Sequence, residues 1–464
     1  MSEIILVDIG STFTKVTAVD LAKAQLIAQA NAPTTPVDVS IGLQDALHNL
    51  GLPQQVITRA RKLACSSAAG GLRMVAIGLV QDLTAKAAKL AALGAGARVL
   101  RTYSFQLTES DLEEISQLKP DIILLAGGTD GGNTANILHN ARALATLPQG
   151  MPVVIAGNRS VGPEVAKCFP ERFSTYLAPN VMPQIGKLEV EPAREVIRKV
   201  FMEKIIFAKG LHKAARLIEG IFMPTPAAVL RAGRLLSEGT ALLRGWGDLI
   251  IVDVGGATTD VHSLGAGTPS KAGVVSRGLP EPFAKRTVEG DLGMRVSVLS
   301  LVEAINPAIL ARDLNWEKEA VEQRADQLSA RPELLPQTPE EVSFDHALGY
   351  QAVKLAVGRH AGRLSELYTP SGLIWIQDGK DLSLVDKVIG TGGVMVNSEN
   401  AHIMLKGAEQ QEETPLELRP ERPRYFLDGK YILASMGLLA EEYPEVAFRI
   451  LEESLEDHEL ARRD

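Results

Sequence analysis

Cysteine and histidine are scarce in this chain of 464 residues, which contains two cysteines and eight histidines. Cys65 and Cys168 are too few for a disulfide framework or a thiolate metal cage, and such low usage is typical of a reducing cytoplasm. No two histidines form an HExxH-like pair, so we do not expect a dedicated transition-metal site. Cys65 and His262 are therefore interpreted as buried filler rather than as ligands.

Long apolar runs and an excess of positive charge are also missing. No apolar segment reaches about 18 residues, so we expect no membrane-spanning helix. The N-terminus enters a strand pattern without a basic run before an apolar stretch, which argues against a signal peptide and favours a cytoplasmic location. The net charge of -8 leaves no basic face for nucleic acid, so that class of partner is not expected.

The sequence does contain the pattern of an α/β protein. Hydrophobic residues make up 45% and charged residues 22%, and the length exceeds what one core usually serves, so we expect two or three domains. Strand patterns alternate with helical ones. The expected strands are Ile4–Val7, Lys15–Val19, Asp121–Leu125, Val153–Ala156, Leu249–Val254 and Leu373–Gln377. The expected helices are Val39–Leu50, Val75–Leu93, Ala135–Ala145, Pro192–Ile218, Ala227–Glu238, Leu301–Pro332 with breaks at Asn306-Pro307 and Arg331-Pro332, and Gln337–Arg363.

Three segments indicate how the chain is divided. The main boundary is expected near Gly245, where the sequence LLRGWGD separates a helix from a new strand. The polar run Gly407–Arg424 is interpreted as a surface excursion with extended parts. The acidic, amphipathic tail from Glu441 is interpreted as a solvated closing helix.

A strand–Asp–Gly pattern occurs twice, far apart along the chain. Asp8–Thr17 reads DIGSTFTKVT and Asp253–His262 reads DVGGATTDVH, and both follow an apolar strand. Each copy is predicted to be a β-hairpin with a tight glycine turn. The alternative is two ordinary hairpins with polar turns, which the repetition disfavours. Aligned without gaps, the matching pairs are Asp8 and Asp253, Ile9 and Val254, Gly10 and Gly255, Thr14 and Thr259, and Val16 and Val261.

These hairpins carry the groups that hold the phosphates and the metal of a nucleotide. An aspartate at a strand end can hold Mg²⁺, often through water, so Asp8 and Asp253 are candidate metal ligands and catalytic residues. Backbone N–H groups at glycines can approach a phosphate closely, and hydroxyls can donate to it. Two such hairpins facing each other would hold Mg–ATP between two domains. The candidate nucleotide-binding residues here are Gly10, Ser11, Thr12, Lys15, Gly255, Gly256, Thr258 and Thr259.

The residues that follow the two turns differ in charge. Lys15 could point at a phosphate or out to water, and Asp260 occupies the equivalent place in the second copy. Opposite charges at equivalent places indicate that the two copies do different jobs. Asp260 is accordingly a third candidate catalytic residue.

A third glycine-rich segment, Lys387–Val396, reads KVIGTGGVMV. Glycines after an apolar strand would let adenine and ribose lie against the backbone. A lone GTGG is a weak signal, but its position after both hairpins strengthens it. The candidate nucleotide-binding residues in this segment are Gly390, Thr391, Gly392 and Gly393.

In this order, the three motifs resemble those of the actin–Hsp70–hexokinase superfamily. Asp8–Lys15 looks like its first phosphate motif, Asp253–Asp260 like its second and Gly390–Val396 like its adenosine motif. Segments that begin at Pro224 and Ala434 are similar to its two connecting helices. The resemblance implies an α/β fold with two duplicated actin-like (RNase H-like) ATPase domains around a nucleotide cleft, with insertions. The implied spans are 1–244 with an inserted α/β segment, 245–433 with a helical insertion, and 434–464 returning to the first domain.

A narrower resemblance is to the MutL/GlmL family of accessory proteins, which accompany adenosylcobalamin-dependent glutamate mutase and related aminomutases. It rests on the segments DIGSTFTKVTAVD, CSSAAGGLRM, LLAGGTDGGN, RTVEGDLGMR and IGTGGVMV. The resemblance implies a chaperone-like protein that binds ATP or ADP with Mg²⁺ and exchanges damaged, adenosyl-less cobalamin out of its mutase. It leaves assembly into a homo-oligomer open. The chain lacks the DxHxxG pattern of cobalamin lower-axial ligation, so direct cobalamin binding is not indicated.

Met223 departs from the superfamily pattern. In the Hsp70 branch an acid precedes the Pro-Thr of the first connecting helix and orients the attacking water, and here that place holds Met223. Either another acid serves, with Asp8 and Asp260 the first candidates, or hydrolysis is slow, which suits a nucleotide switch. Two rivals stay open. A small-molecule kinase would need a carboxylate base over a polar substrate pocket, and a scaffold would use nucleotide only as a stabiliser.

Two glycine-rich loops have both a functional and a structural interpretation. Leu124–Asn133 is a strand end, a loop and the start of a helix. It could present N–H groups to an anion, or its glycines could only permit tight packing, with Asp130 as a helix cap. Ser66–Gly71 could be a close-approach loop or a tight strand connection.

The segment Arg286–Arg295 combines acids, glycines and two arginines. Glu289 and Asp291 could reach Mg²⁺ or the nucleotide base, or they could belong to a solvated loop with a helix cap. Arg286 and Arg295 could pair with phosphate or with Glu289.

Overall fold

The computed structural model describes residues 3–10, 12–35, 38–67, 72–205, 218, 222–370, 372–398 and 400–457. The chain forms two compact units, and each is described by itself. Unit 1 comprises Met1–Leu235, Gly278–Pro282 and Leu433–Ile450, and unit 2 comprises Leu236–Arg277, Phe283–Ile432 and Leu451–Asp464. Along the sequence, unit 1 first passes into unit 2 within helix α10 (Thr225–Glu238). In the described parts of the chain, no helix is both long and apolar enough to cross a membrane.

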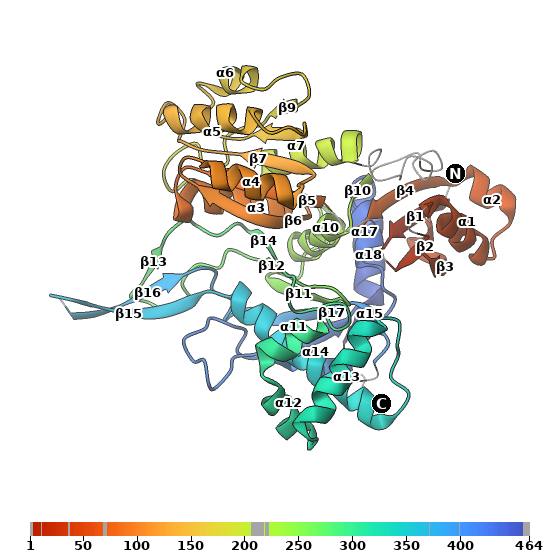
Figure 1. Cartoon of the computed structure of the whole chain (residues 1–464). Helices are drawn as coiled ribbons and strands as arrows, with labels where there is room; N and C mark the ends of the chain where they lie inside the picture. The colour runs from red at the N-terminus through yellow and green to blue at the C-terminus, as the bar shows by residue number, and fades with distance from the viewer. Residues whose placement is uncertain are drawn as a thin grey trace. The chain divides into compact units, whose positions relative to one another are not determined.

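The first sheet of unit 1 has the spatial order β10-β4-β1-β2-β3 (Figure 1). Strand β1 lies in the middle, antiparallel to β2 and parallel to β4. Its residues Ile4–Val7 are almost completely buried, as expected for a central strand with an apolar run. Helices α1 (Val39–Asn49) and α2 (Gln54–Arg59) connect β3 to β4. The strands are β1 (Glu3–Ile9), β2 (Phe13–Asp20), β3 (Gln25–Pro33), β4 (Arg61–Ser66) and β10 (Phe222–Pro224).

A second sheet of unit 1 is inserted between β4 and β10. Its spatial order is β6-β5-β7-β8-β9, and every pair of neighbouring strands is parallel. The strands are β5 (Leu72–Gly78), β6 (Ala97–Ser104), β7 (Ile122–Leu125), β8 (Pro152–Ile155) and β9 (Ser174–Leu177). The helices are α3 (Lys86–Gly94), α4 (Glu109–Leu118), α5 (Ala135–Ala145), α6 (Gly162–Lys167) and α7 (Glu191–Val200), with π-helical turns at Gln81–Ala85 and Phe201–Ile205.

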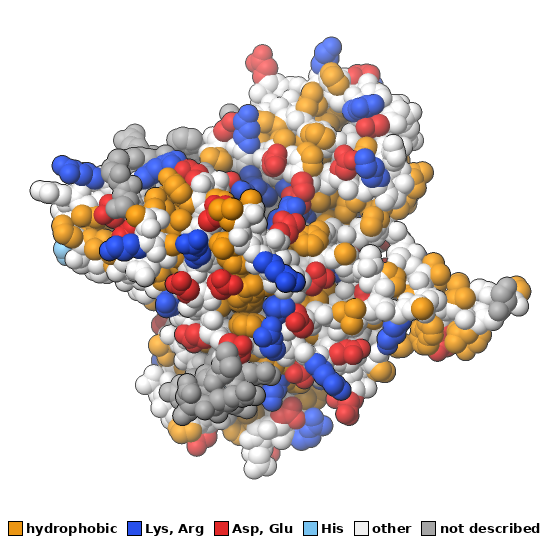
Figure 2. Space-filling view, turned by 180° about the vertical axis from the view of Figure 1, so that it is seen from behind, with side chains coloured by type: hydrophobic (Ala, Val, Ile, Leu, Met, Phe, Trp, Pro, Cys, Tyr) orange, Lys and Arg blue, Asp and Glu red, His pale blue; other side chains and the backbone are white. Residues whose placement is uncertain are grey.

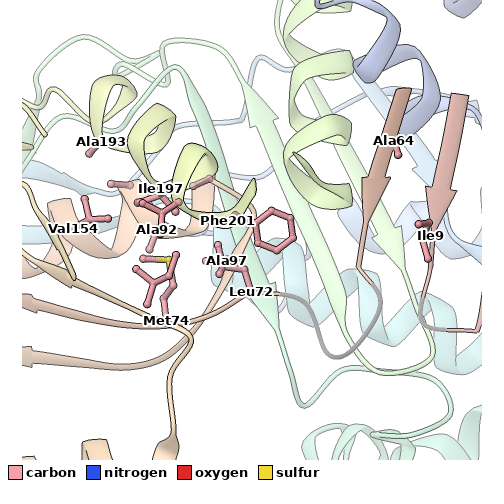
Figure 3. Packing of buried hydrophobic residues seen from close by; sticks show 14 of the residues in the cluster. Ile9, Ala64, Leu72, Met74, Ala92, Ala97, Val154, Ala193, Ile197 and Phe201 are labelled. Carbon is pink, nitrogen blue, oxygen red and sulfur yellow. The ribbon is translucent and has the colours of Figure 1, made fainter. Parts of the chain in front are cut away.

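The predicted helix Val75–Leu93 is wrong in its first half. The segment begins inside strand β5, and the α-helix starts only at Lys86. A short apolar run such as VAIG has no periodicity that separates a buried strand from a buried helix. Figure 3 shows the outcome: Met74 of β5 packs with Ala92 of α3 and Ile197 of α7 in one core. The predicted helix Pro192–Ile218 matches α7 at its start, and most of its later part lies outside the described residues.

The main sheet of unit 2 has the spatial order β14-β12-β11-β17-β18-β19. Strand β11 is again central, antiparallel to the next strand in sequence, β12, and parallel to β17. The strands are β11 (Leu249–Val254), β12 (Thr259–Leu264), β14 (Ala284–Glu289), β17 (Lys387–Thr391), β18 (Arg424–Leu427) and β19 (Glu456–Asp457).

The two main sheets share one topology. In each, the first strand is flanked by an antiparallel second strand, which pairs with a third, and by a parallel fourth strand, which pairs with a fifth. In unit 1 these are β1, β2, β3, β4 and β10, and in unit 2 they are β11, β12, β14, β17 and β18. This is the strand order of the actin-like (RNase H-like) domain, so the predicted duplication of that fold is confirmed.

Helices in unit 2 cover the main sheet and end where the sequence indicates. Asn306 accepts a hydrogen bond from Ala308 N and begins α12, so the predicted break at Asn306-Pro307 is confirmed. Phe344 and Leu348 of α14 are completely buried in the core of this unit. The unit 2 helices are α11 (Val298–Ile305), α12 (Pro307–Leu314), α13 (Lys318–Ala330), α14 (Pro339–His360), α15 (Gly393–Val396) and α16 (Ala401–Leu405). Helix α17 (Leu433–Leu439) belongs to unit 1, and α18 (Pro444–Ser454) begins in unit 1 and ends in unit 2.

A small second sheet of unit 2 contains β13 (Val274–Arg277), β16 (Gly372–Asp378) and β15 (Arg363–Thr369) in that order. Strands β15 and β16 form a long hairpin that extends as an arm (Figure 1). Hydrophobic side chains gather on this arm (Figure 2), and Tyr368 is 77% exposed. The predicted strand Leu373–Gln377 is confirmed as part of β16.

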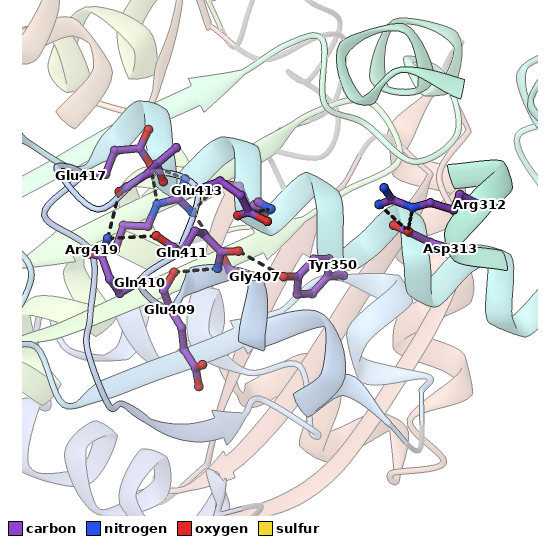
Figure 4. Close-up of polar contacts among 12 residues, drawn as sticks. Arg312, Asp313, Tyr350, Gly407, Glu409, Gln410, Gln411, Glu413, Glu417 and Arg419 are labelled. Atoms are coloured by element: carbon purple, nitrogen blue, oxygen red, sulfur yellow. Dashed lines mark hydrogen bonds and ion pairs between the residues drawn. The ribbon is translucent and has the colours of Figure 1, made fainter. Parts of the chain in front are cut away.

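The polar run Gly407–Arg424, predicted to be a surface excursion with extended parts, is largely irregular, and polar contacts hold it to α14 (Figure 4). Gln410 N donates to Pro420 O over 2.8 Å, which closes the segment on itself. Arg419, only 4% exposed, donates to Glu417 and to the backbone oxygen of Lys354 in α14. A buried arginine with this many acceptors fixes the segment in place.

Two buried histidines lie in unit 2. His360 is bonded to Ser263 through Nε2 and to Thr287 through Nδ1, at 2.7 and 2.8 Å. His262 Nδ1 is buried and has no hydrogen-bond partner in the described part of the chain. Burial, and secondly Arg286, lowers the pKa of His262 well below its ordinary value. Burial, and then Lys285 and Lys380, lowers the pKa of His360 in the same way.

These histidines predict that unit 2 loses stability in mild acid. Below about pH 6.5 the unfolded chain binds protons at both rings, whereas the folded chain does not, so the free energy of unfolding falls as the pH falls. The expected slope is up to about 1.4 kcal/mol per pH unit for each ring. Urea unfolding followed by tryptophan fluorescence checks this, because Trp246, Trp316 and Trp375 are the chain's three tryptophans and all lie in unit 2.

The matched control is His262→Leu, which removes a buried polar atom without a partner and one of the two rings. Between pH 6.5 and 5, we expect the number of protons taken up on unfolding to fall by about one, so the free energy of unfolding depends less steeply on pH. We also expect unchanged or higher stability at pH 8, since an unsatisfied buried group is lost. An identical acid slope in this variant would show that other groups dominate.

Candidate functional site

The two strand–Asp–Gly motifs fold into hairpins of the same geometry. In unit 1, Asp8 pairs with Lys15 and Ile9 with Thr14 across the β1–β2 ladder. In unit 2, Asp253 pairs with Asp260 and Val254 with Thr259 across β11–β12. The gapless alignment of the two motifs is therefore also their structural alignment, and the predicted hairpins are confirmed.

One hydrogen bond closes each turn. Gly10 N donates to Phe13 O over 3.0 Å, and Gly255 N donates to Thr258 O over 2.9 Å. A Cβ atom on Gly10 would lie 2.6 Å from Phe13 O, so a larger residue would push the turn apart. Thr12 is exposed in the first turn, and Ser11 lies outside the described residues.

Asp8 is held by three neighbours in unit 1. The Thr225 hydroxyl donates to Asp8 Oδ1 over 2.7 Å, and the Lys15 ammonium lies 3.8 Å from Asp8 Oδ2. Cys65 Sγ donates to Asp8 Oδ1 over 3.4 Å. Lys15 thus extends towards the carboxylate, and its contact with a phosphate stays a prediction. The carboxylate is only about 5% exposed and fixed in direction.

Cys65 belongs to these surroundings, although the sequence gave no reason to place it there. It is the cross-strand partner of Asp8 on β4, and it is completely buried. Burial, and secondly the negative charge of Asp8, raises the pKa of the Cys65 thiol well above its ordinary value. The group is therefore a neutral thiol that donates to Asp8 rather than a nucleophilic thiolate.

Met223 lies one strand further from Asp8. It is the β10 partner of Cys65 and is 2% exposed. A thioether neither accepts a proton nor orients water well. The neighbouring Thr225 is the polar residue of this segment that does reach Asp8, and the motif Pro224-Thr225-Pro226 was its signal in the sequence.

In unit 2 the second hairpin and the GTGG segment lie next to each other. Strand β17 runs parallel to β11 and places Thr391 beside Asp253. Gly392 has a φ of 103°, and a Cβ on it would lie 2.9 Å from Asp253 Oδ1 and 2.3 Å from Val254 O. Only glycine fits there. The structure thus brings together two motifs that are far apart in sequence.

The other residues of the GTGG segment have distinct surroundings. Gly390 is buried within β17, whereas Gly393 is exposed at the start of α15. The Thr391 hydroxyl donates to Asp428 Oδ2 over 3.1 Å, and Asp428 Oδ1 accepts from Ile432 N. Gly393 is therefore the exposed residue of this segment, whereas the Thr391 hydroxyl already has an acceptor.

Asp260 is engaged by an arginine. Arg286 of β14 donates through Nε to Asp260 Oδ1 over 2.8 Å, and its Nη2 lies 2.5 Å from the same oxygen. The Thr258 hydroxyl donates to Asp260 Oδ2 over 3.1 Å. Lys15 and Asp260, which occupy equivalent places, thus make different contacts: the first extends to a carboxylate and the second neutralises a buried guanidinium.

Two equivalent threonines use their hydroxyls inside the protein. Thr259 is completely buried and donates to Leu292 O over 2.7 Å. Thr14 is also completely buried, and its hydroxyl is 3.0 Å from that of Thr34. The contribution of Thr259 to nucleotide binding stays a prediction, but its proton already has an acceptor.

The segment Arg286–Arg295 packs on the turn of the second hairpin. Met294 N donates to Gly255 O over 3.1 Å, and Arg295 N donates to Gly256 O over 2.8 Å. The segment therefore supports the glycine turn through its backbone.

The arginines of that segment do not pair with Glu289, so that alternative is wrong. Arg295 donates to Asp345 Oδ2 over 2.6 Å, and Arg286 donates to Asp260. Glu289 instead accepts from Arg359 at the end of α14, which also binds Asp291 at 2.7 Å. Hydrogen bonds from Arg359 lower the pKa of Asp291. Sequence patterns do not reveal such pairings, because the partners are far apart along the chain.

The donor set of the two hairpins fits a magnesium nucleotide. Mg²⁺ prefers oxygen ligands and is usually bound by one or two carboxylates together with phosphate oxygens and water. Asp8 and Asp253 supply one strand-end carboxylate in each unit. Among the residues that the structure describes, no three His, Cys, Asp or Glu side chains form a cage that could hold a metal by itself. Each of these carboxylates by itself could therefore supply one ligand to a cation that phosphate oxygens also bind.

The duplicated sheets, each with an aspartate at the end of its first strand and a glycine turn after it, define a protein of the actin-like ATPase fold. Residues 4–455 match the family model described as MutL protein. The chain is also 50% identical over 459 residues to Protein MutL of Clostridium tetanomorphum, which covers 98% of this chain and 99% of that protein. The chain therefore belongs to the MutL family, and the resemblance read from its motifs is confirmed.

Solved structures with similar folds are more distant. A diol dehydratase-reactivating factor in nucleotide-free form is 11% identical, with a TM-score of 0.37, and the match covers 96% of this chain and 100% of that one. Component A of (R)-2-hydroxyglutaryl-CoA dehydratase from Acidaminococcus fermentans is 8% identical, with a TM-score of 0.32, and the match covers 96% and 100%.

Proposed function

We propose that this chain is a cytoplasmic accessory protein that binds Mg–ATP through its two hairpins and, depending on the bound nucleotide, assembles or reactivates an adenosylcobalamin-dependent aminomutase of the glutamate mutase type. The observation that carries the nucleotide part is the identical register and turn of the hairpins at Asp8 and Asp253. Membership of the MutL family supports the mutase part, because the resemblance to that family implies a partner of this kind.

The residues of each unit have separate roles in this proposal. Asp8 and Asp253 would hold the magnesium ion, directly or through water, and the ion would offset the charge of the phosphates. Thr225 and Cys65 keep the Asp8 carboxylate in one orientation. The backbone at Gly10, Gly255 and Gly256 would donate to phosphate oxygens.

Lys15 and the GTGG segment complete the proposed ligand set. The Lys15 ammonium would contact a phosphate oxygen as a point charge. The backbone of Gly392 and Gly393 would accept the adenosine part, since Gly392 leaves no room for a side chain beside Asp253.

Hydrolysis is proposed to be slow. Met223 is no base, and both oxygens of the Asp260 carboxylate already accept hydrogen bonds. The Asp8 carboxylate is turned towards Thr225, Cys65 and Lys15. Slow ATP hydrolysis suits a protein whose bound nucleotide determines how tightly it binds a partner. It suits a metabolic kinase poorly.

Calorimetric titration with Mg–ADP and Mg–ATP tests the nucleotide part of the proposal. We expect binding at micromolar to millimolar ligand, and no heat of binding at millimolar ligand would refute this part. Product analysis after incubation with ATP separates the rivals. Free phosphate alone supports the proposal, and a phosphorylated metabolite supports a kinase.

The partner part is tested with purified glutamate mutase and its inactivated, adenosyl-less form. We expect co-purification that changes between Mg–ATP and Mg–ADP, and recovery of mutase activity only when adenosylcobalamin, ATP and this protein are all present. Recovery at the same rate without ATP would remove the nucleotide switch from the proposal.

A further inference from the structure

The inserted sheet of unit 1 has the topology of a ligand-binding domain in its own right. Its order is β6-β5-β7-β8-β9 and its strands are all parallel. The chain leaves β5 to form β6 on one side and then forms β7 on the other side. In open sheets of this order, small ligands bind outside the carboxyl ends of the strands where the winding reverses. Here that place lies between Leu79, after β5, and the loop 126–133, after β7.

Buried amides hold this loop in one conformation. Asn158 is completely buried, accepts from Gly131 N over 3.1 Å and donates to the backbone oxygens of Gly132 and Asn133. Asn180 is 3% exposed and donates to Gly128 O over 3.1 Å. The loop is thus prebuilt rather than dependent on a ligand for its shape.

Asp130 has a different role from the helix cap predicted for it. Its Oδ1 accepts from Asn180 Nδ2 and from Arg159 N, at 2.9 and 3.0 Å. The side chain that caps the start of α5 is Asn133, whose Oδ1 accepts from Asn136 N. Asp130 is therefore part of the frame that fixes the loop.

A run of backbone donors in the loop lacks acceptors. Within the described parts of the chain, the N–H groups of Gly127, Gly128 and Thr129 donate no hydrogen bond, whereas Ala126 N and Asp130 N on either side donate to Ile77 O and Pro183 O. Gly127 and Gly128 are buried residues, with φ of 145° and 71°. Buried N–H groups nearly always have a partner in protein, water or ligand, and successive donors of this kind form anion-binding concavities.

A strained, exposed aromatic residue lies two strands away. Phe105 follows β6, is 58% exposed and has a φ of 66°, a conformation that is costly for an aromatic residue. Two bonds hold it there: Phe105 N donates to Leu79 O over 3.1 Å, and the buried Asn140 donates to Phe105 O over 2.9 Å. Leu79 also lies next to the loop, since a Cβ on Gly127 would be 3.7 Å from Leu79 N. The ring and the donors thus lie along one sheet edge.

We propose that this edge binds a small molecule that combines a planar ring system with a phosphate. The ring system stacks on Phe105, and phosphate oxygens accept from the N–H groups of Gly127, Gly128 and Thr129. Flavin mononucleotide, adenosine monophosphate and a cobalamin, which carries a planar macrocycle and a nucleotide phosphate, share this chemistry. The site is separate from the two hairpins, and the inference does not rest on their binding of Mg–ATP.

The test titrates the full chain with three probes in the absence of Mg²⁺: flavin mononucleotide, adenosine monophosphate and hydroxocobalamin. Phe105→Asn removes the ring while tolerating the left-handed backbone. Gly128→Ala alters the loop, because its Cβ would meet Asn133 O at 2.3 Å. Tyr368→Ala removes another exposed aromatic ring, on the unit 2 arm, and serves as the matched control.

We expect at least one probe to bind, and the probe that binds shows which kind of planar ring system the site accepts. Phe105→Asn should weaken binding by about tenfold or more, as expected for loss of one stacked ring. Tyr368→Ala should leave the affinity for the probe unchanged, and Asp8→Asn should also bind the probe although its affinity for Mg–ATP is lowered. The proposal is overturned if no probe binds at millimolar concentration, or if a bound probe has the same affinity for Phe105→Asn. Far-ultraviolet circular dichroism of each variant confirms that the sheet is retained.

Discussion

Replacing Asp8 with asparagine is expected to lower the affinity for Mg–ATP by about 10- to 100-fold, the range for loss of an interaction with a charged group. The substitution keeps the size of the side chain and removes the negative charge that the proposed metal ion needs. The neighbours described for this carboxylate are Thr225, Lys15 and Cys65. None of the three is a carboxylate, so none of them can replace the lost negative charge. Calorimetric titration of the variant with Mg–ATP measures the change.

Thr225→Val is the matched control for this prediction. It has nearly the same shape as threonine, leaves the carboxylate in place and removes only the hydroxyl that donates to Asp8 Oδ1. We expect a smaller loss of affinity, up to about tenfold, because orientation and not charge is lost. Asp253→Asn should change affinity in the same direction as Asp8→Asn. Equal affinity of the wild-type protein and Asp8→Asn for Mg–ATP would contradict the assignment of the first hairpin.

Replacing Arg286 with methionine is expected to destabilise unit 2 by about 3–5 kcal/mol, the usual cost of leaving one partner of a buried ion pair alone. The side chains of Arg286 and Asp260 are 3% and 11% exposed, and two guanidinium nitrogens approach the same carboxylate oxygen. Without the arginine, the Asp260 carboxylate stays buried beside the second hairpin with only the Thr258 hydroxyl as a donor of the bonds described above. Urea unfolding followed by tryptophan fluorescence reports this unit alone.

The double variant Arg286→Met with Asp260→Asn separates the pair from its parts. Removing both charges is expected to recover most of the lost stability, since the buried charge is gone and the shape is kept. If the double variant is as unstable as the sum of the two single variants, the pair contributes no coupling and the packing of Arg286 explains the loss. The same variants also show whether Asp260 takes part in hydrolysis once its arginine is removed.

How much could be predicted from the sequence depends on the range of the interactions. The hairpins were predictable, because a tight glycine turn between two strand patterns fixes which residues pair across it. The helix break at Asn306 was predictable from local chemistry alone. The first half of Val75–Leu93 was not, because four apolar residues fit a strand and a helix equally well.

The contacts of the candidate site show the same limit. The sequence indicated Asp8, Asp253 and the GTGG segment, since each stands at a strand end beside glycine. It did not indicate that Cys65 donates to Asp8 or that Arg286 neutralises Asp260. Those side chains meet only because neighbouring strands of a sheet align residues that are distant in the chain.

By itself, the sequence determined the class of fold, the two hairpins and the family, because strand period, glycine turns and motif order are written in neighbouring residues. Only the tertiary structure decided which charges are available to a ligand. Lys15 extends to Asp8, and Asp260 is paired with Arg286. The backbone N–H groups of Gly127, Gly128 and Thr129, after β7, have no acceptor in the described part of the chain. The reason is physical: whether a polar group is satisfied depends on the partners that folding brings within hydrogen-bond distance, and sequence separation carries no information about that distance.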